Sequence, residues 1–158
     1  MELPALGPRG EGWVGAQLVL IALIGLAGAI AATGPGGPPA YPLVAGGSIV
    51  LVAGGSFAVR GILDLGSNLT PFPRPRAGAT LVETGVYRYV RQPIYAGGVL
   101  AGGGWAVATA SVPALVLTAA LLVLFDAKSR REEAWLEDQV PTYAGYRRRT
   151  RRFVPGLY

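Results

Sequence analysis

Three long runs without a charged side chain dominate this chain of 158 residues. The runs cover residues 12–32, 41–59 and 92–125. A helix needs about 20 apolar residues to cross the roughly 30 Å of hydrocarbon in a bilayer. The first two runs therefore each predict one membrane span, over about 12–32 and about 41–60. The first run is too long for a signal peptide and lacks a basic flank, so we expect it to be a retained span.

The third run is too long for a single crossing, because one helix over it would extend about 50 Å. Pro113 lies inside this run, and proline is accepted in the first turn of a helix but disfavoured deeper. We therefore predict a hairpin, with one span from about 93 to 110 and another starting at Pro113. The expected fold is a single all-α membrane domain over 1–158, with four transmembrane helices and a cytoplasmic C-terminal helical tail.

The basic residues all fit one orientation of these four spans. They lie before the first span, between the second and third, and after the fourth, whereas the 33–40 loop and the 110–113 turn are uncharged. The positive-inside rule then places both termini and the 64–92 loop in the cytoplasm. We expect an integral protein of a bacterial inner (plasma) membrane, with membrane lipids and no nucleic acid among its partners. The arginines of 147–152 serve as a topology signal that contacts anionic headgroups.

The chain contains neither cysteine nor histidine. This composition excludes disulfides, thiol nucleophiles, thiolate metal sites and the commonest general base. We therefore expect no metal and a reaction that needs little acid–base chemistry.

Glycine pairs recur inside the predicted spans, and a nucleotide-binding loop is one interpretation of them. None of these pairs lies in a strand–turn–helix context. Gly98 and Gly102 have the small-xxx-small spacing that is typical of closely packed membrane helices. The pattern favours helix packing.

The boundary between the second and third spans carries unusual residues. Residues 68–76 alternate proline with bulky side chains, which keeps the backbone extended and predicts the lid or wall of a site. Residues 87–95 combine tyrosines and arginines with Pro93. An ordinary interfacial anchoring belt is the alternative for this second segment. Because proline at a helix start leaves nearby amides free, Pro93 favours a ligand site.

A pair of carboxylates, Glu132 and Glu133, is expected at the same side of the membrane as the boundary between the second and third spans. The last predicted helix continues past Asp126 until Pro141, and Glu132 and Glu133 point about 100° apart around it. Lys128 and Glu132 are i,i+4 partners, so a solvated salt bridge is the alternative to a cofactor-binding carboxylate. Local sequence alone leaves both interpretations open and favours the salt bridge.

The order of these motifs resembles a known superfamily over about residues 60–155. The segments Asn68–Arg76 and Leu81–Tyr95, then Glu132-Glu133, Tyr143-Ala144-Gly145-Tyr146 and Arg152-Phe153-Val154-Pro155, occur in that order. They resemble the isoprenylcysteine carboxyl methyltransferase and phospholipid methyltransferase superfamily. Its hallmark is Gly-x-Tyr-x-x-x-Arg-His-Pro-x-Tyr, then two spans, a Glu-Glu pair, Tyr-x-x-Tyr and Arg-Phe-x-Pro. One position departs from the hallmark, because Gln92 stands where the family has histidine.

The resemblance implies that S-adenosylmethionine binds in a cytoplasmic pocket formed by the catalytic part, about 64–155. By position, it implies a set of cofactor-binding residues: Leu81, Val82, Tyr87, Gln92, Pro93, Ile94, Tyr95, Glu132 and Glu133. It further implies catalytic roles for Arg91, Gln92 and Glu132, and a substrate contact at Lys128. Glutamine can donate and accept hydrogen bonds but cannot titrate near neutrality, so it suits binding and not proton transfer.

The expected reaction is methyl transfer from S-adenosylmethionine to a lipophilic or small acceptor at the cytoplasmic membrane face. A carboxylate, a thiol and an amine all remain open as the acceptor. One alternative is a membrane reductase of related architecture that uses a nicotinamide cofactor. The other is a non-catalytic four-span membrane protein, which predicts charges inside the spans, where only Arg60 comes close.

Overall fold

The structure is a computed structural model that describes residues 6–8, 10–72 and 80–154, and all regular elements within them are helical. The long helices are α1 (Glu11–Ala32), α2 (Tyr41–Leu65), α3 (Pro93–Ala108) and α4 (Val112–Gln139), and a short helix α5 (Tyr143–Arg149) follows. Two 3₁₀ turns, η1 (Gly66–Asn68) and η2 (Gly85–Arg88), lie between α2 and α3. Within the described residues no strand forms, and a single parallel bridge joins Val90 to Arg151.

Three helices of the described chain are long and apolar enough to cross a membrane, namely Glu11–Ala32, Tyr41–Asn68 and Val112–Gln139. Helix α3 has 16 residues, so it extends about 24 Å and falls short of the roughly 30 Å of hydrocarbon. Three of the four predicted spans thus have helices of full crossing length. The predicted third span is present as helix α3, but it is shorter than a complete crossing.

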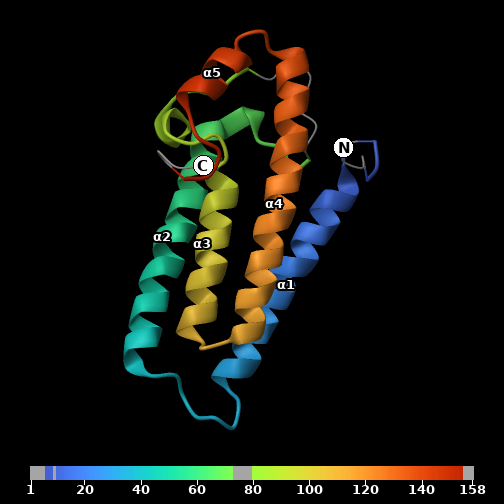
Figure 1. Ribbon diagram of the computed structural model, residues 1–158. Helices are drawn as coiled ribbons and strands as arrows, with labels where there is room; N and C mark the ends of the chain where they lie inside the picture. Colours follow the sequence, from blue (N-terminus) through green and yellow to red (C-terminus); the bar gives the residue numbers. More distant parts are fainter. Residues whose placement is uncertain (1–5, 9, 73–79, 155–158) are drawn as a thin grey trace.

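The predicted hairpin is present, with α3 and α4 joined at residues 109–111 (Figure 1). Pro113 lies in the first turn of α4, as its position in the sequence predicted. The Ser111 hydroxyl caps this helix by accepting a hydrogen bond from the Ala114 amide at 3.2 Å. Proline and a serine cap together define where the new helix begins.

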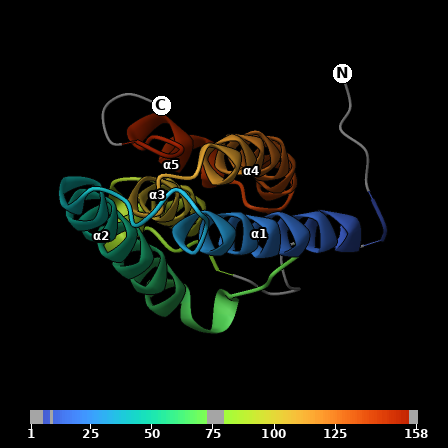
Figure 2. The same ribbon diagram turned by 90° about the horizontal axis from the view of Figure 1, so that it is seen from below.

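Helix α3 packs against α1, α2 and α4 and is therefore the centre of the bundle (Figure 2). Its contact with α2 is made through the backbone. A Cβ atom added to Gly54 would lie 2.5 Å from the Ala101 amide nitrogen, and one added to Gly97 would lie 2.5 Å from the Gly54 carbonyl oxygen. Only glycine permits two helix backbones to approach this closely.

A second set of glycines on α3 faces α4. A Cβ atom added to Gly98 would lie 3.4 Å from the Phe125 ring, and one added to Gly102 would lie 3.0 Å from the Thr118 hydroxyl. Both positions of the small-xxx-small spacing therefore lie in a helix interface. This confirms the packing interpretation of the glycine pairs.

Helix α1 is tied to α3 and α4 by side-chain hydrogen bonds to its backbone. The Trp105 indole donates to the Ile24 carbonyl at 3.2 Å, and the Ser111 hydroxyl donates to the Ala27 carbonyl at 3.2 Å. Because both donors are satisfied in this way, the bundle core carries no unpaired polar group at these two positions.

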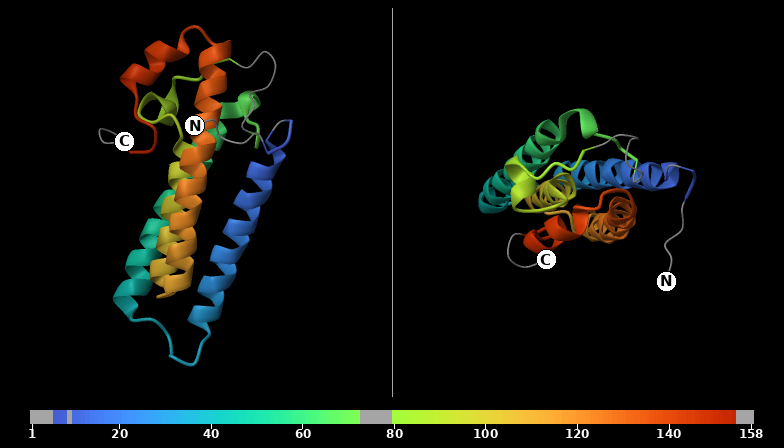
Figure 3. Two further views of the ribbon diagram at one scale, coloured as in Figure 1. Left: turned by 45° about the vertical axis from the view of Figure 1, so that its right-hand side comes forward. Right: turned by 90° about the horizontal axis from the view of Figure 1, so that it is seen from above.

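The polar segments of the chain gather at one end of the bundle. The start of α1, the end of α2, the start of α3, the end of α4 and α5 lie together there, and the 33–40 and 109–111 connections lie at the other end (Figures 1 and 3). Helix α3 ends and α4 begins at the same turn, but α4 has 28 residues and α3 has 16, so α4 extends about 18 Å further from that turn. The short α3 therefore leaves space beside the last turns of α4.

Candidate functional site

A cavity of about 240 Å³ occupies the space beyond the start of α3. It is bounded by the start of α1, the end of α2, the segments 68–72 and 80–82, the start of α3, the last turns of α4, and α5. Most of its wall is apolar. Among the described residues, the charged groups that line it are Arg91, Lys128 and Glu132.

Glu132 is held at the cavity wall by two residues from the start of α3. The Tyr95 hydroxyl donates to one carboxylate oxygen at 2.5 Å, and the Gln92 side-chain amide donates to the other at 3.3 Å. The Tyr95 ring stacks on Phe125 of α4, with ring centroids 4.4 Å apart and an angle of 16° between the planes. The carboxylate is therefore fixed by groups whose own positions are set by packing.

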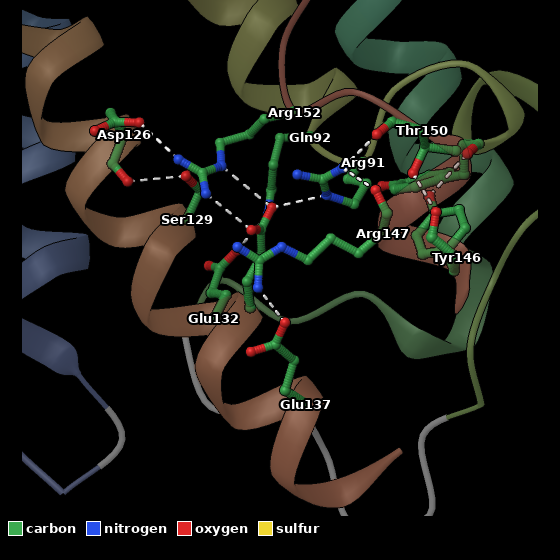
Figure 4. A network of polar contacts seen from close by, with 12 residues as sticks. Arg91, Gln92, Asp126, Ser129, Glu132, Glu137, Tyr146, Arg147, Thr150 and Arg152 are labelled. Atoms are coloured by element: carbon green, nitrogen blue, oxygen red, sulfur yellow. Dashed lines mark hydrogen bonds and ion pairs between the residues drawn. The ribbon is translucent and has the colours of Figure 1, made fainter. Parts of the chain in front are cut away.

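Glu133 points away from the cavity into a network of ion pairs. Its carboxylate accepts from Arg91 Nε at 3.0 Å and from Arg152 Nη2 at 2.9 Å, and its side chain is only 3% exposed. Arg152 also pairs with Asp126 at 2.9 Å (Figure 4). The two neighbouring carboxylates thus face different surroundings, as the helical geometry predicted.

Arg91 fastens the C-terminal segment to the start of α3. Its Nη1 atom donates to the Thr150 carbonyl at 2.5 Å and to the Arg147 carbonyl at 3.1 Å (Figure 4). Its backbone amide donates to the Arg151 carbonyl at 2.8 Å. The segment that carries Gln92 is therefore held in place by residues about 60 positions later in the chain.

The C-terminal segment, which consists of α5 and residues 150–152 and is called the strap below, also closes the cavity on the side of η2. The Tyr146 hydroxyl donates to the Tyr87 carbonyl at 2.7 Å. Burial raises the pKa values of Tyr87, Tyr143 and Tyr146 well above the usual range. All three phenols are therefore neutral at physiological pH and act as hydrogen-bonding groups, not as bases.

Lys128 is only 1% exposed. Its amino group donates to the Gln17 side chain of α1 at 2.8 Å and to the Pro71 carbonyl at 3.0 Å, and it lies 5.1 Å from the centre of the Tyr95 ring. The alternative of a solvated Lys128–Glu132 salt bridge is wrong, because the lysine is buried and bonded to these other groups. It connects α1, α4 and the segment after η1 across the cavity.

The structure brings most of the predicted site residues together. Those that line the cavity are Leu81, Val82, Tyr87, Arg91, Gln92, Ile94, Tyr95, Lys128 and Glu132. Pro93 is buried behind the wall as the first residue of α3 and packs near Gly61, and Glu133 lies in the ion-pair network. Of the predicted lid, residues 68–72 line the cavity and residues 73–76 lie outside the described part of the chain, as does Pro155.

Sequence reasoning missed several lining residues. Gln17 is the one amide side chain in the first charge-free run, which was an available signal. Tyr143 and Tyr146 were recognised only as a motif, and both line the cavity. Ile62, Leu65 and Leu136 also contribute to the wall, and nothing in their local sequence separates them from other apolar helix residues.

Comparison with known families gives a specific result. The family model described as phospholipid methyltransferase matches residues 43–140, more than half of the chain. The match covers α2, η2, α3 and α4, and with them the residues that place Gln92, Tyr95 and Glu132 at the cavity. No curated protein gives a significant match to the chain. The chain belongs to the phospholipid methyltransferase family, within the superfamily of membrane methyltransferases that its motifs resemble.

Proposed function

We propose that this protein transfers a methyl group from S-adenosylmethionine to a lipophilic or small acceptor at the cytoplasmic face of the membrane. The family match supports membrane methyltransferase activity. The observation that carries the rest is the carboxylate of Glu132, which is held by Tyr95 and Gln92 at the wall of a mostly apolar cavity. A fixed carboxylate suits a ligand with an amino group, ribose hydroxyls and a positive charge.

The lining residues fit such a ligand by their chemistry. Leu81, Val82 and Ile94 provide apolar surface for a flat base or a hydrocarbon chain, and Tyr87 provides an aromatic face. Arg91 is largely occupied by Glu133 and two backbone carbonyls, so in this proposal it positions the segment that carries Gln92. Glu133 has the same structural role, and Glu132 is the carboxylate that contacts the cofactor.

The protein's contribution to such a reaction is positioning and exclusion of water. The cofactor would supply an electrophilic methyl group on a sulfonium with a good, neutral leaving group. Glu132, Gln92 and Tyr95 would orient the ligand, and the apolar wall would keep water away from the reacting atoms. No histidine or cysteine is available as a base. An acceptor carboxylate or thiolate would need none, and an amine acceptor would have to arrive neutral.

We propose that α3 also crosses the membrane, which gives four crossings in all, and that it is short because the 89–92 segment enters the protein below the membrane surface. The cavity end, which carries the start of α1 and also α5, would then face the cytoplasm of a bacterial inner membrane (Figure 1). Backbone that is not helical is tolerated at this depth where it lines a protein cavity. A reporter that is active only in the periplasm should be silent when fused after Tyr158, and activity there would contradict this topology.

Ligand binding tests the proposed function directly. Purified protein in detergent should bind radiolabelled S-adenosylmethionine, and S-adenosylhomocysteine should compete while a reduced nicotinamide dinucleotide should not. Binding of the nicotinamide instead would favour the reductase alternative. Binding of neither ligand would favour a non-catalytic membrane protein.

A further inference from the structure

Tyr143 has a buried hydroxyl group without a hydrogen-bond partner among the described residues. Tyr143 is the first residue of α5, it is 1% exposed, and it lines the cavity. Two neighbouring tyrosines differ from it, because the hydroxyl of Tyr95 donates to Glu132 and that of Tyr146 donates to the Tyr87 carbonyl. Tyr143 is thus a lining tyrosine whose polar atom is unused within the described chain.

A buried hydroxyl without a partner destabilises the fold, and such groups are uncommon in native structures. Phenylalanine would fill the same space and keep the edge contact with the Tyr146 ring, whose centre lies 5.9 Å away. Packing alone therefore does not account for tyrosine at this position. A partner that arrives with a ligand does account for it.

The surroundings indicate which kind of ligand group this would be. Burial raises the pKa of the Tyr143 hydroxyl, so the group is protonated and can donate a hydrogen bond. The carboxylate of Glu133 and the guanidinium of Arg91 both act electrostatically on Tyr143. Glu133 is paired with Arg91 and with Arg152, whereas Arg91 also lines the same cavity as Tyr143. Arg91 binds its protein partners through Nε and Nη1, so Nη2 takes part in none of those bonds. A neutral donor beside a cation suits an anionic oxygen.

We propose that the Tyr143 hydroxyl donates a hydrogen bond to the carboxylate of the bound S-adenosylmethionine, next to the positive charge of Arg91. Tyr143 is then a second polar anchor for the cofactor, and Glu132 is the anchor for its amino group or ribose. This inference rests on the proposed function. It gives a role to a residue that the sequence identified only as part of a motif, and it assigns that residue to one end of the ligand.

The test compares Tyr143→Phe with the native protein by ligand binding, with two ligands, and by thermal melting. Binding of S-adenosylmethionine should weaken about 10- to 100-fold, because a hydrogen bond to a charged group is lost. Binding of decarboxylated S-adenosylmethionine, which lacks the carboxylate, should be equal for the two proteins. Without ligand, Tyr143→Phe should melt at the same temperature as the native protein or higher, because the hydroxyl has no protein partner to lose.

Two other tyrosines provide controls. Tyr146→Phe removes the 2.7 Å bond to the Tyr87 carbonyl, so it should lower the melting temperature of the ligand-free protein. Tyr41 is 83% exposed at the far end of the bundle, and Tyr41→Phe should leave both measurements unchanged.

Each contrary result overturns a defined part of the proposal. Unchanged S-adenosylmethionine affinity in Tyr143→Phe would remove Tyr143 from the site while leaving the proposed function in place. An equal loss for both ligands would refute the carboxylate assignment. A clear drop in the melting temperature of ligand-free Tyr143→Phe would show that the hydroxyl already has a protein partner. Failure of the native protein to bind S-adenosylmethionine would overturn both the function and this inference.

Discussion

The α2–α3 interface and the cavity end of the same bundle are held together in opposite ways. In the interface, backbones meet at glycines such as Gly54 and Gly97, and α3 itself contains no charged side chain. At the cavity end, α3, α4 and the C-terminal segment are joined by Arg91, Glu133 and Arg152. In the first region the helices are in close backbone contact, whereas in the second region ion pairs join the elements around the cavity that the short α3 leaves open.

This difference shows how a small membrane protein can combine a rigid scaffold with a polar cavity. Helices that touch through their backbones have few alternative arrangements, so the interface fixes where Gln92 and Tyr95 emerge. The ion pairs then hold the strap over the cavity without filling it. We therefore expect substitutions in the α2–α3 interface to prevent folding. At the cavity end, we expect some substitutions to lower stability and others to weaken ligand binding.

The largest effect should come from Gly54→Leu. A Cβ atom at this position already lies 2.5 Å from the Ala101 amide nitrogen, so α2 and α3 would have to separate. We expect a loss of more than about 3 kcal/mol, the upper part of the range for overpacking, seen as aggregation or early melting in detergent. Gly55→Leu is the matched control, because no atom lies within 4 Å of a Cβ atom there. Equal behaviour of the two variants would refute the backbone contact.

A smaller loss of stability should follow from Glu133→Gln. The substitution leaves Arg91 and Arg152 facing a neutral group, and removal of one partner from a buried ion pair costs about 3 kcal/mol. The melting temperature should fall, and cofactor affinity measured at a temperature where the variant is folded should change little. Glu137→Gln provides the control, since Glu137 pairs with Arg147 at the surface. A folded Glu133→Gln protein that had lost the cofactor would contradict the structural role of this residue.

The smallest effects should come from Gln92. Gln92→Ala leaves one oxygen of Glu132 without its donor at 3.3 Å, and we expect cofactor binding to weaken by about 1–3 kcal/mol.

Gln92→His should retain binding and introduce an inflection in the rate near pH 6.5. The native enzyme should show no such inflection from this position between about pH 6 and 8, because an amide does not titrate there. Native-like binding by Gln92→Ala would mean that Gln92 does not line the site.

Local sequence patterns predicted the helices and the different directions of the Glu132 and Glu133 side chains. The start of α4 follows from Pro113, and the separation of Glu132 from Glu133 follows from the helical repeat. The sequence could not show that α3 is too short for a full crossing. The charge-free run begins at Gln92, and this start does not depend on how deep in the membrane the cavity lies. The partners of Lys128 were not predictable either, since Gln17 and Pro71 are distant in sequence and meet it only in the folded bundle.

The central claim is that Glu132 contacts the cofactor while its neighbour Glu133 supports the fold. Titration of radiolabelled S-adenosylmethionine into Glu132→Gln, together with melting of the ligand-free protein, tests this claim most directly. We expect at least tenfold weaker binding, because the charge of the carboxylate is lost, with a melting temperature close to that of the native protein. Native affinity in Glu132→Gln would contradict it.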